Sequence, residues 1–557
     1  MKYTVAFSGP AGSGVNTAWL IVWDYFTKLW YDVVGDKEYQ SIIKWWNNTF
    51  INYISDDWKY LSSNIDLIFA YDKLAITRNE KVYNLKNIIE IEKTDMLNMV
   101  SVAMFFTMIW KTIEEINQIV KDYFGNKKIP QIIQERNDKA LLQWSNLIEN
   151  WKLIIDNLEE LIESEKQDKH TGQKFIDGNY TVAEWAVDAD LSFYSAYPMT
   201  PASTLIKYIT KHKNVEFLQW EDEIAVAMSM LGAKFAGKRA MCGTSGGGFA
   251  LMSETISMAN QMEIWWVYIM SQRWGPSTWT PTFTEQWDLL YALNASFWDT
   301  KPIVVYPSTI QNAYDLTQKV LNWADYYQHP IIILLDKQFS ESYFSTDLKR
   351  NLDSKDKKID KIKFNLENKE VFEGIEDMEQ DKFLRYKLTE DWISPYTYPG
   401  VKNWDFIATS YEHTQSWSVT EDPEEKVQMT EKRHKKLEIF KQNEFNQNFK
   451  WFEVINENAK IFFITMWINR LVLEEYVRQN SEYGIIIIEV LQPLDDELQN
   501  FIEGREVEKL IFVELNYSWQ LETYLTWKLW LNCEKWKWKI DRIRKYNNYP
   551  LFLEDLK

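Results

Sequence analysis

An acidic residue at the start of a predicted helix is the side chain best suited to chemistry in this sequence. Glu223 lies in the segment 220–230, which reads WEDEIAVAMSM, so its carboxyl leads directly into an apolar helical face. Burial raises the pKa of a carboxyl and lets it share a proton with a bound partner, which is general acid–base chemistry. Glu221 is the second candidate for this role. The structural alternative is that these acids only interact with the helix dipole.

A second chemical feature is a stiff turn that follows a predicted strand. Residues 196–203 read AYPMTPAS, with two prolines that stiffen the chain before a predicted helix over 204–210. This arrangement would hold the Thr200 hydroxyl at the carboxyl end of the strand, where ligands bind in open α/β sheets. A rigid turn that only starts the helix is an equal alternative.

The third feature is an arginine at the end of a strongly apolar strand. Arg273 precedes the turn-like segment 274–282, which reads WGPSTWTPT. Its guanidinium offers a fork of donors that matches a carboxylate. An ordinary surface arginine is the alternative, but the position of Arg273 between two ligand-type turns favours a binding role.

Two glycine-rich turns each lie between a predicted strand and a predicted helix. Residues 9–14 read GPAGSG, and residues 243–249 read GTSGGGF. Small residues in such turns let backbone N–H groups and a helix N-terminus approach an anion. The first turn lacks the G-x-G-x-x-G spacing of dinucleotide-binding folds, so tight packing of the helix on the strand is the favoured interpretation there.

The elements that must position these side chains alternate between strand and helix. Residues 2–8 form a predicted strand that precedes a turn and a helical run, a βαβ opening that favours a parallel sheet. We therefore predict a multidomain α/β fold. The first domain is expected over 1–165 and is mostly helical from 86, and a polar linker follows over 163–178. The central domain is expected over 179–345. A loop-rich connecting region over 346–450, with one helix over 426–442, leads to a last α/β domain over 451–557.

Charge and cysteine content exclude several classes of protein. The formal net charge of −19 argues against a nucleic acid or an anionic membrane surface as partner. The two cysteines, Cys242 and Cys533, form no C-x-x-C pair, so this chain alone builds neither a four-cysteine iron–sulfur site nor a zinc ribbon. Segment 96–110 is too short and interrupted to span a bilayer, and no signal peptide is apparent. We expect a cytoplasmic protein.

Taken in order, the motifs resemble the alpha subunit of 2-oxoacid:ferredoxin oxidoreductases, in the form that carries the gamma domain fused in front of alpha. The resemblance covers nearly the whole chain. It implies that the fold contains a domain of the type that binds the pyrimidine ring of the coenzyme in thiamine enzymes. The segments that carry it are FSGPAGSGVNTAWL (7–20), EYQSIIKWWNNTF (38–50), YPMTPAS (197–203), EDEIAVAMSMLGAKFAG (221–237), TSGGGFALMSE (244–254), QRWGPSTWTPTFTEQWDLL (272–290), RYKLTEDWISPYTYPG (385–400), ATSYEHTQSWSVTED (408–422) and FVELNYSWQL (512–521).

The resemblance implies a role for each candidate residue. Glu223 would hydrogen-bond the aminopyrimidine ring of thiamine diphosphate, while Thr200 and Arg273 would hold the oxo group and the carboxylate of a 2-oxoacid. The remaining residues implied to contact the cofactor are Tyr197, Pro198 and Gly247. The implied reaction is oxidative decarboxylation of a 2-oxoacid, expected to be 2-oxoglutarate, to an acyl-CoA, with electrons passed to ferredoxin.

The same resemblance implies that the chain is one part of a heteromer. It has no G-D-G…N segment for Mg²⁺ and diphosphate and no cluster-binding cysteines, so a separate beta subunit would carry Mg²⁺ and the iron–sulfur clusters. Exposed apolar surface is expected around Tyr197 and Phe249, where beta would cover it. The alternatives are a subunit for pyruvate or another 2-oxoacid, and a non-catalytic assembly subunit or a decayed one.

Tryptophan stands where the family signatures have glycine. The chain has 28 Trp and only 18 Gly in 557 residues, so Gly is roughly 3% of the chain where about 7% is usual. We predict that many of these Trp are glycines, written as Trp because UGA codons were translated with the wrong genetic code. An aromatic-rich protein is the alternative. Glycine is expected at Trp19, Trp45, Trp46, Trp392, Trp417 and Trp519, and a small residue at Trp274, Trp279 and Trp287.

Overall fold

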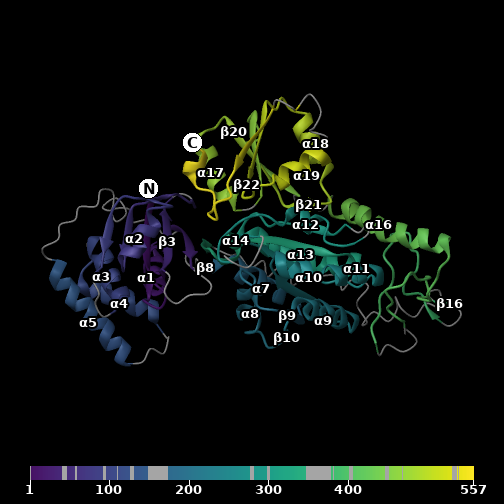
Figure 1. The fold of residues 1–557 in the computed structure, drawn as a ribbon, viewed down its shortest axis with the longest axis horizontal. Coiled ribbons are helices and arrows are strands. Elements are labelled where there is room, and N and C mark those ends of the chain that lie inside the picture. The colour runs from purple at the N-terminus through teal and green to yellow at the C-terminus, as the bar shows by residue number, and fades with distance from the viewer. Residues whose placement is uncertain are drawn as a thin grey trace.

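A computed structural model shows three α/β lobes, and the connecting helix α16 (Pro423–Phe445) extends to one side of the central lobe (Figure 1). The structure describes residues 2–29, 31–39, 47–56, 59–91, 96–109, 111–125, 131–148, 174–275, 281–297, 301–346, 378–379, 382–399, 406–445, 451–466, 468–529, 536 and 539–556. The predicted multidomain α/β fold is confirmed.

The N-terminal lobe is built on a mixed seven-stranded sheet, not on the parallel sheet expected from its βαβ opening. The strand β3 (Asn47–Ser55), which the sequence analysis missed, lies between β1 (Lys2–Pro10) and β2 (Asp32–Glu38) and is antiparallel to both. The other strands, in spatial order, are β7 (Ile88–Glu90) and β5 (Leu67–Ala70) beside β1, and β15 (Tyr343–Thr346) and β8 (Lys174–Asp177) beside β2.

The expected helices of this lobe are present in its described part. They are α1 (Val15–Lys28), α3 (Leu97–Met108), α4 (Ile113–Phe124) and α5 (Gln131–Ile148), and a further short helix, α2 (Lys73–Asn79), was not predicted. A capping box formed by Thr112 and Glu115 fixes the start of α4. The expected linker over 163–178 lies mostly outside the described residues, and its last residues form β8 and the start of the next helix.

The central lobe contains the sheet on which the candidate site is built. Its strand order is β10-β9-β11-β12-β14-β13-β21, and all neighbours are parallel except the pair β13 and β21. The bounds are β9 (Phe193–Ala196), β10 (Glu216–Gln219), β11 (Ala240–Thr244), β12 (Val267–Gln272), β13 (Ile303–Val305), β14 (Ile331–Asp336) and β21 (Val490–Gln492). Its helices are α7 (Gly178–Asp188), α8 (Ser203–Ile209), α9 (Glu223–Phe235), α10 (Gly246–Leu251), α11 (Ser253–Met262), α12 (Leu289–Leu293), α13 (Ile310–Tyr327) and α14 (Lys337–Glu341).

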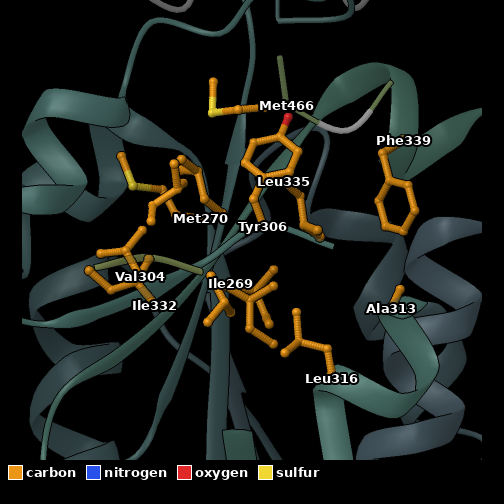
Figure 2. Packing of buried hydrophobic residues seen from close by; sticks show 14 of the residues in the cluster. Ile269, Met270, Val304, Tyr306, Ala313, Leu316, Ile332, Leu335, Phe339 and Met466 are labelled. Atoms are coloured by element: carbon orange, nitrogen blue, oxygen red, sulfur yellow. The ribbon is translucent and has the colours of Figure 1, made fainter. Parts of the chain in front are cut away.

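Apolar strands buried on both faces explain why this sheet is parallel and central. Strands β12 and β14 read VYIMSQ and IIILLD and are buried throughout, which is typical of strands covered by helices on both sides. Figure 2 shows Ile269 of β12 on the side of the sheet where Leu316 of α13 lies, and Ile332 of β14 beside Val304 on the other side. The C-terminal lobe joins the same core, because Met466 lies near Tyr306 and Leu335 in this view.

The C-terminal lobe has a five-stranded sheet in the order β18-β20-β19-β22-β23. Only β18 is antiparallel to its neighbour. The bounds are β18 (Phe452–Ile455), β19 (Ile461–Thr465), β20 (Tyr483–Ile488), β22 (Lys509–Glu514), β23 (Ile540–Arg544), α17 (Asn469–Gln479), α18 (Asp496–Glu503), α19 (Gln520–Lys528) and η3 (Leu553–Leu556). In the described part of the chain, no helix is both long and apolar enough to cross a membrane.

Candidate active site

The candidate site lies where the strand order of the central sheet changes direction. After β9 the chain places β10 on one side of it and β11 on the other. The crevice beyond the carboxyl ends of strands at such a switch point is the usual ligand site of open α/β sheets. The AYPMTPAS turn, the TSGGG turn and Arg273 follow β9, β11 and β12, which are neighbours, so all three motifs meet at this edge.

Glu223 is the first residue of α9 and is almost completely buried, with 3% of its surface exposed. The helix start is fixed by Asp222, whose carboxylate accepts a hydrogen bond of 2.8 Å from the Ala225 N–H. Burial raises the pKa of Glu223, while the nearby Arg273 lowers it. Its Oε1 has no hydrogen-bond partner among the described residues, so this oxygen is available to a ligand. Glu221, the second candidate, is exposed.

A glycine contacts this carboxyl directly. A Cβ on Gly248 would lie 2.5 Å from Glu223 Oε1 and would overlap the Thr244 hydroxyl. The position therefore accepts only glycine without movement of the acid. Gly247, the glycine implied to contact the cofactor, is exposed and has open space around it. The structure thus places Gly248, rather than Gly247, against the proposed acid.

The structure brings Arg273 and Thr200 together. Arg273 is 7% exposed, and its Nη1 donates a 2.6 Å hydrogen bond to the backbone oxygen of Thr200. Burial lowers the pKa of Arg273, while the carboxyls of Asp288 and Glu223 raise it. The guanidinium thus faces two acids and the turn that follows β9.

Asp288 is a site residue that the sequence analysis missed. Its carboxylate lies on Gly246, where a Cβ would come within 2.5 Å of Oδ1, and its N–H donates to Gln272 Oε1 at 2.9 Å. Burial raises the pKa of Asp288 to about 6, and Arg273 lowers it. The only signal in the sequence was its position within segment 272–290, which carried the resemblance.

The rim of the site is apolar and exposed, but only one of the two residues expected there, Tyr197, is exposed. Tyr197 is 37% exposed and Pro198 is exposed beside it, whereas Phe249 is completely buried. Phe249 packs edge-on against Tyr268 and Tyr291, because the inner face of the short helix α10 turns toward the sheet. The exposed apolar residues near Glu223 are instead Ile224 and Met228 of α9 and Leu251 of α10, at 50%, 45% and 50% exposure.

No group of three or more His, Cys, Asp or Glu side chains in the described part of the chain is arranged to hold a metal ion. Cys242 is a free, buried thiol whose pKa is raised to about 12 by burial. Cys533 lies outside the described residues.

Comparison with known proteins shows similarity to subunits of oxidoreductases that act on 2-oxoacids. Residues 184–432 match the family described as pyruvate flavodoxin/ferredoxin oxidoreductase, thiamine diphosphate-binding. The 2-oxoacid:ferredoxin oxidoreductase 1, subunit alpha, of Sulfurisphaera tokodaii is 26% identical over 633 aligned positions, which cover 100% of this chain and 97% of that protein. The 2-oxoglutarate synthase subunit KorA of Methanocaldococcus jannaschii is 34% identical over 167 positions, 29% of this chain and 46% of that protein.

A solved structure supports the fold over the whole length. It is the 2-oxoglutarate:ferredoxin oxidoreductase of Magnetococcus marinus, with 2-oxoglutarate, coenzyme A and succinyl-CoA bound. It superposes with a TM-score of 0.81 at 23% identity, covering 100% of this chain and 98% of that one. The candidate site thus lies within the segment that matches a thiamine diphosphate-binding family, in a chain similar to oxidoreductase subunits. The chain is related along its whole length to the alpha subunits of 2-oxoacid:ferredoxin oxidoreductases, as its motifs indicated.

Proposed function

We propose that this chain is the alpha subunit, with a gamma-type domain fused in front, of an enzyme that oxidatively decarboxylates 2-oxoglutarate to succinyl-CoA and passes the electrons to ferredoxin. The observation that carries the proposal is the buried Glu223 carboxyl with a free oxygen, at the edge where three ligand-type turns meet. The proposed substrate is the one printed in the names of KorA and of the solved structure.

The residues present fit the pyrimidine half of thiamine diphosphate. Glu223 Oε1 is an unpartnered acceptor, and the absence of a side chain at Gly248 lets the glycine-rich turn approach this carboxyl closely, with open space at the neighbouring Gly247. The raised pKa suits Glu223 to hold or release a proton at a ring nitrogen. Tyr197 and Pro198 would border the ring from the rim. The bound coenzyme would supply the electron sink that decarboxylation of a 2-oxoacid requires.

Substrate binding is proposed for the side chains beside this acid. Arg273 would bind the substrate carboxylate with its remaining N–H donors, and the Thr200 hydroxyl would contact the oxo group. The burial of Arg273 excludes water from that contact and so strengthens it.

The heteromer is part of the proposal. A beta subunit would carry the Mg²⁺–diphosphate site and the iron–sulfur clusters, and it would cover Ile224, Met228 and Leu251 beside Glu223. Coenzyme A and ferredoxin would complete the set of partners. A cytoplasmic location fits the free Cys242 thiol.

The test is co-expression of this chain with a beta subunit encoded beside it, followed by a viologen-dye assay. We expect dye reduction that requires both 2-oxoglutarate and coenzyme A. A preference for pyruvate would assign the same chemistry to a different substrate and contradict the proposed one. Absence of reduction with every 2-oxoacid, in a complex shown to contain thiamine diphosphate and intact clusters, would favour a non-catalytic subunit.

We also propose that many of the tryptophans are glycines in the native chain, encoded by UGA. The departures from the family signatures at Trp274 and Trp287 support this, since both lie in the loop that carries Arg273 and Asp288. Trp45, Trp46 and Trp279 lie outside the described residues. The Trp19 side chain is buried, and its indole N–H donates a 3.0 Å hydrogen bond to Ile51 O. The proposal of glycine at position 19 is therefore supported by the sequence motif alone.

A further inference from the structure

Three tryptophans lie at backbone positions that favour glycine. Trp392, Trp417 and Trp519 have φ angles of 58°, 60° and 55°. A side chain in this left-handed region costs roughly 1–2 kcal/mol, and for a bulky residue it is a real outlier. Nine non-glycine residues in the described part of the chain have positive φ, and three of them are Trp. Trp makes up only 28 of the 557 residues, so the left-handed positions are enriched in it.

The turn at Trp417 shows why glycine is required there. The N–H of Trp417 donates to Thr414 O at 3.1 Å, and the N–H of Thr414 donates to Ser418 O at 2.8 Å, while His413 and Val419 pair across the turn. This is the pattern of a hairpin whose last loop residue is left-handed and forms a bulge. Glycine is the usual residue at that bulge because it has no Cβ to oppose the conformation.

Trp392 and Trp519 repeat this requirement in two other contexts. The N–H of Trp392 closes a turn on Thr389 O at 3.1 Å. Trp519 precedes α19 as its N-cap without any side-chain cap, and its half-buried ring lies 4.3 Å from the Arg544 guanidinium. Neither indole is needed to form the turn in which it lies.

A fourth position is sterically, rather than conformationally, suited to glycine. Trp185 of α7 is 1% exposed, and its ring centroid lies 2.8 Å from that of Tyr314 on α13. Aromatic pairs have centroids about 4.5–7 Å apart, so this helix contact has no room for both rings. By contrast, Trp323, also on α13, lies 4.9 Å from Phe440 in an ordinary edge-on pair.

We infer that positions 185, 392, 417 and 519 are glycine in the native protein, encoded by UGA, whereas Trp323 is a true tryptophan. This inference rests on the proposed recoding and extends it, because it separates tryptophan positions that are glycine in the native chain from a position that is a true tryptophan. Glycine would remove the backbone strain at three turns and let α7 and α13 approach closely. The strain of three such residues, about 3–6 kcal/mol in total, is a substantial fraction of a stability margin of about 5–15 kcal/mol.

The decisive test is peptide mapping by mass spectrometry of the protein purified from its own cells. We expect glycine masses at positions 185, 392, 417 and 519 and a tryptophan mass at position 323. An indole-containing peptide at any of the four positions, or glycine at 323, overturns the assignment. The measurement involves neither substrate nor coenzyme, so its failure is distinct from failure of the enzymatic proposal.

A second test asks whether the backbone argument is correct in a recombinant chain. The triple variant W392G/W417G/W519G is compared with the all-Trp chain and with the matched control W323G by thermal unfolding. We expect the triple variant to have a higher Tm than the all-Trp chain, and W323G to have a lower one. A triple variant whose Tm falls as W323G does would contradict the inference.

Discussion

Glu223 owes its proposed role to the surroundings of its carboxyl. Its neighbour Glu221 is the same residue type two positions earlier, but its side chain is exposed to solvent. Burial raises the pKa of Glu223 and leaves one oxygen unpartnered. The helix start that holds it there is formed by Asp222, so a single short motif supplies both the acid and its support.

Replacing Glu223 by Gln is expected to lower kcat by about 10²–10⁴-fold, because an amide cannot exchange the proton that a general acid–base residue must transfer. Steady-state kinetics of the assembled enzyme measure this effect. The matched control is Glu221→Gln, which should keep wild-type kcat. Equal rates for E223Q and wild type would remove Glu223 from the mechanism.

Asp288 is expected to make substrate binding depend on pH. Its carboxyl has a pKa raised to about 6, and in its ionised form it competes with a substrate carboxylate for Arg273. KM for the 2-oxoacid should therefore rise as the pH increases through about 6. We expect the total rise in KM to be about tenfold or less, which corresponds to an interaction free energy equivalent to about one pKa unit. In Asp288→Asn this rise should disappear. A KM profile that is the same in both proteins would show that Asp288 does not act through Arg273.

At the scale of elements, the turn before α10 must approach α9 closely. Gly248→Ala is expected to lower the free energy of unfolding by about 1–3 kcal/mol, because the added methyl group overlaps Thr244 and contacts Glu223. The control for stability is Gly247→Ala, which has open space and should be neutral or stabilising by about 1 kcal/mol or less. Denaturant titration of both variants measures the difference, and equal destabilisation would contradict the close contact.

The elements that the sequence predicted well are those with local signals. The strands β9, β11 and β12, their turns and the start of α9 lie where alternation, proline and acidic residues placed them. Strand β3 was missed although its segment TFINYI is rich in strand-forming residues, and its antiparallel place between β1 and β2 is set by pairing with both. The burial of Phe249 likewise depends on the orientation of a short helix against the sheet.

Asp288 was missed because contacts between distant residues place it. The loop before it is held by the C-terminal lobe: Gln286 donates from its N–H to Leu515 O at 2.8 Å, and Gln520 accepts from the Leu290 N–H at 2.9 Å. No local pattern in the sequence reveals a contact over about 230 residues.

At the scale of the whole molecule, buried carboxyls between lobes link stability to pH. Glu489, beside β21, accepts a hydrogen bond of 2.8 Å from Asn312 and another from Ser308, both near the start of α13. Burial raises its pKa to about 7. The folded state thus binds a proton that the unfolded state loses at lower pH, so stability falls as the pH rises from about 4 through about 7.

Glu489→Gln should weaken this pH dependence, because the amide has no proton to lose. We expect the Tm of wild type to fall more steeply than that of the variant between about pH 5 and pH 8. Thermal unfolding across this range measures the slopes. Parallel curves would mean that Glu489 does not titrate differently in the folded and unfolded states.

The most direct test of the central claim is a structure of the assembled alpha–beta complex with thiamine diphosphate bound. We expect the Glu223 carboxyl within hydrogen-bond distance of a pyrimidine nitrogen, with the ring beside the glycine-rich turn 244–248 and the guanidinium of Arg273 facing the substrate side. A coenzyme bound away from Glu223 would contradict it.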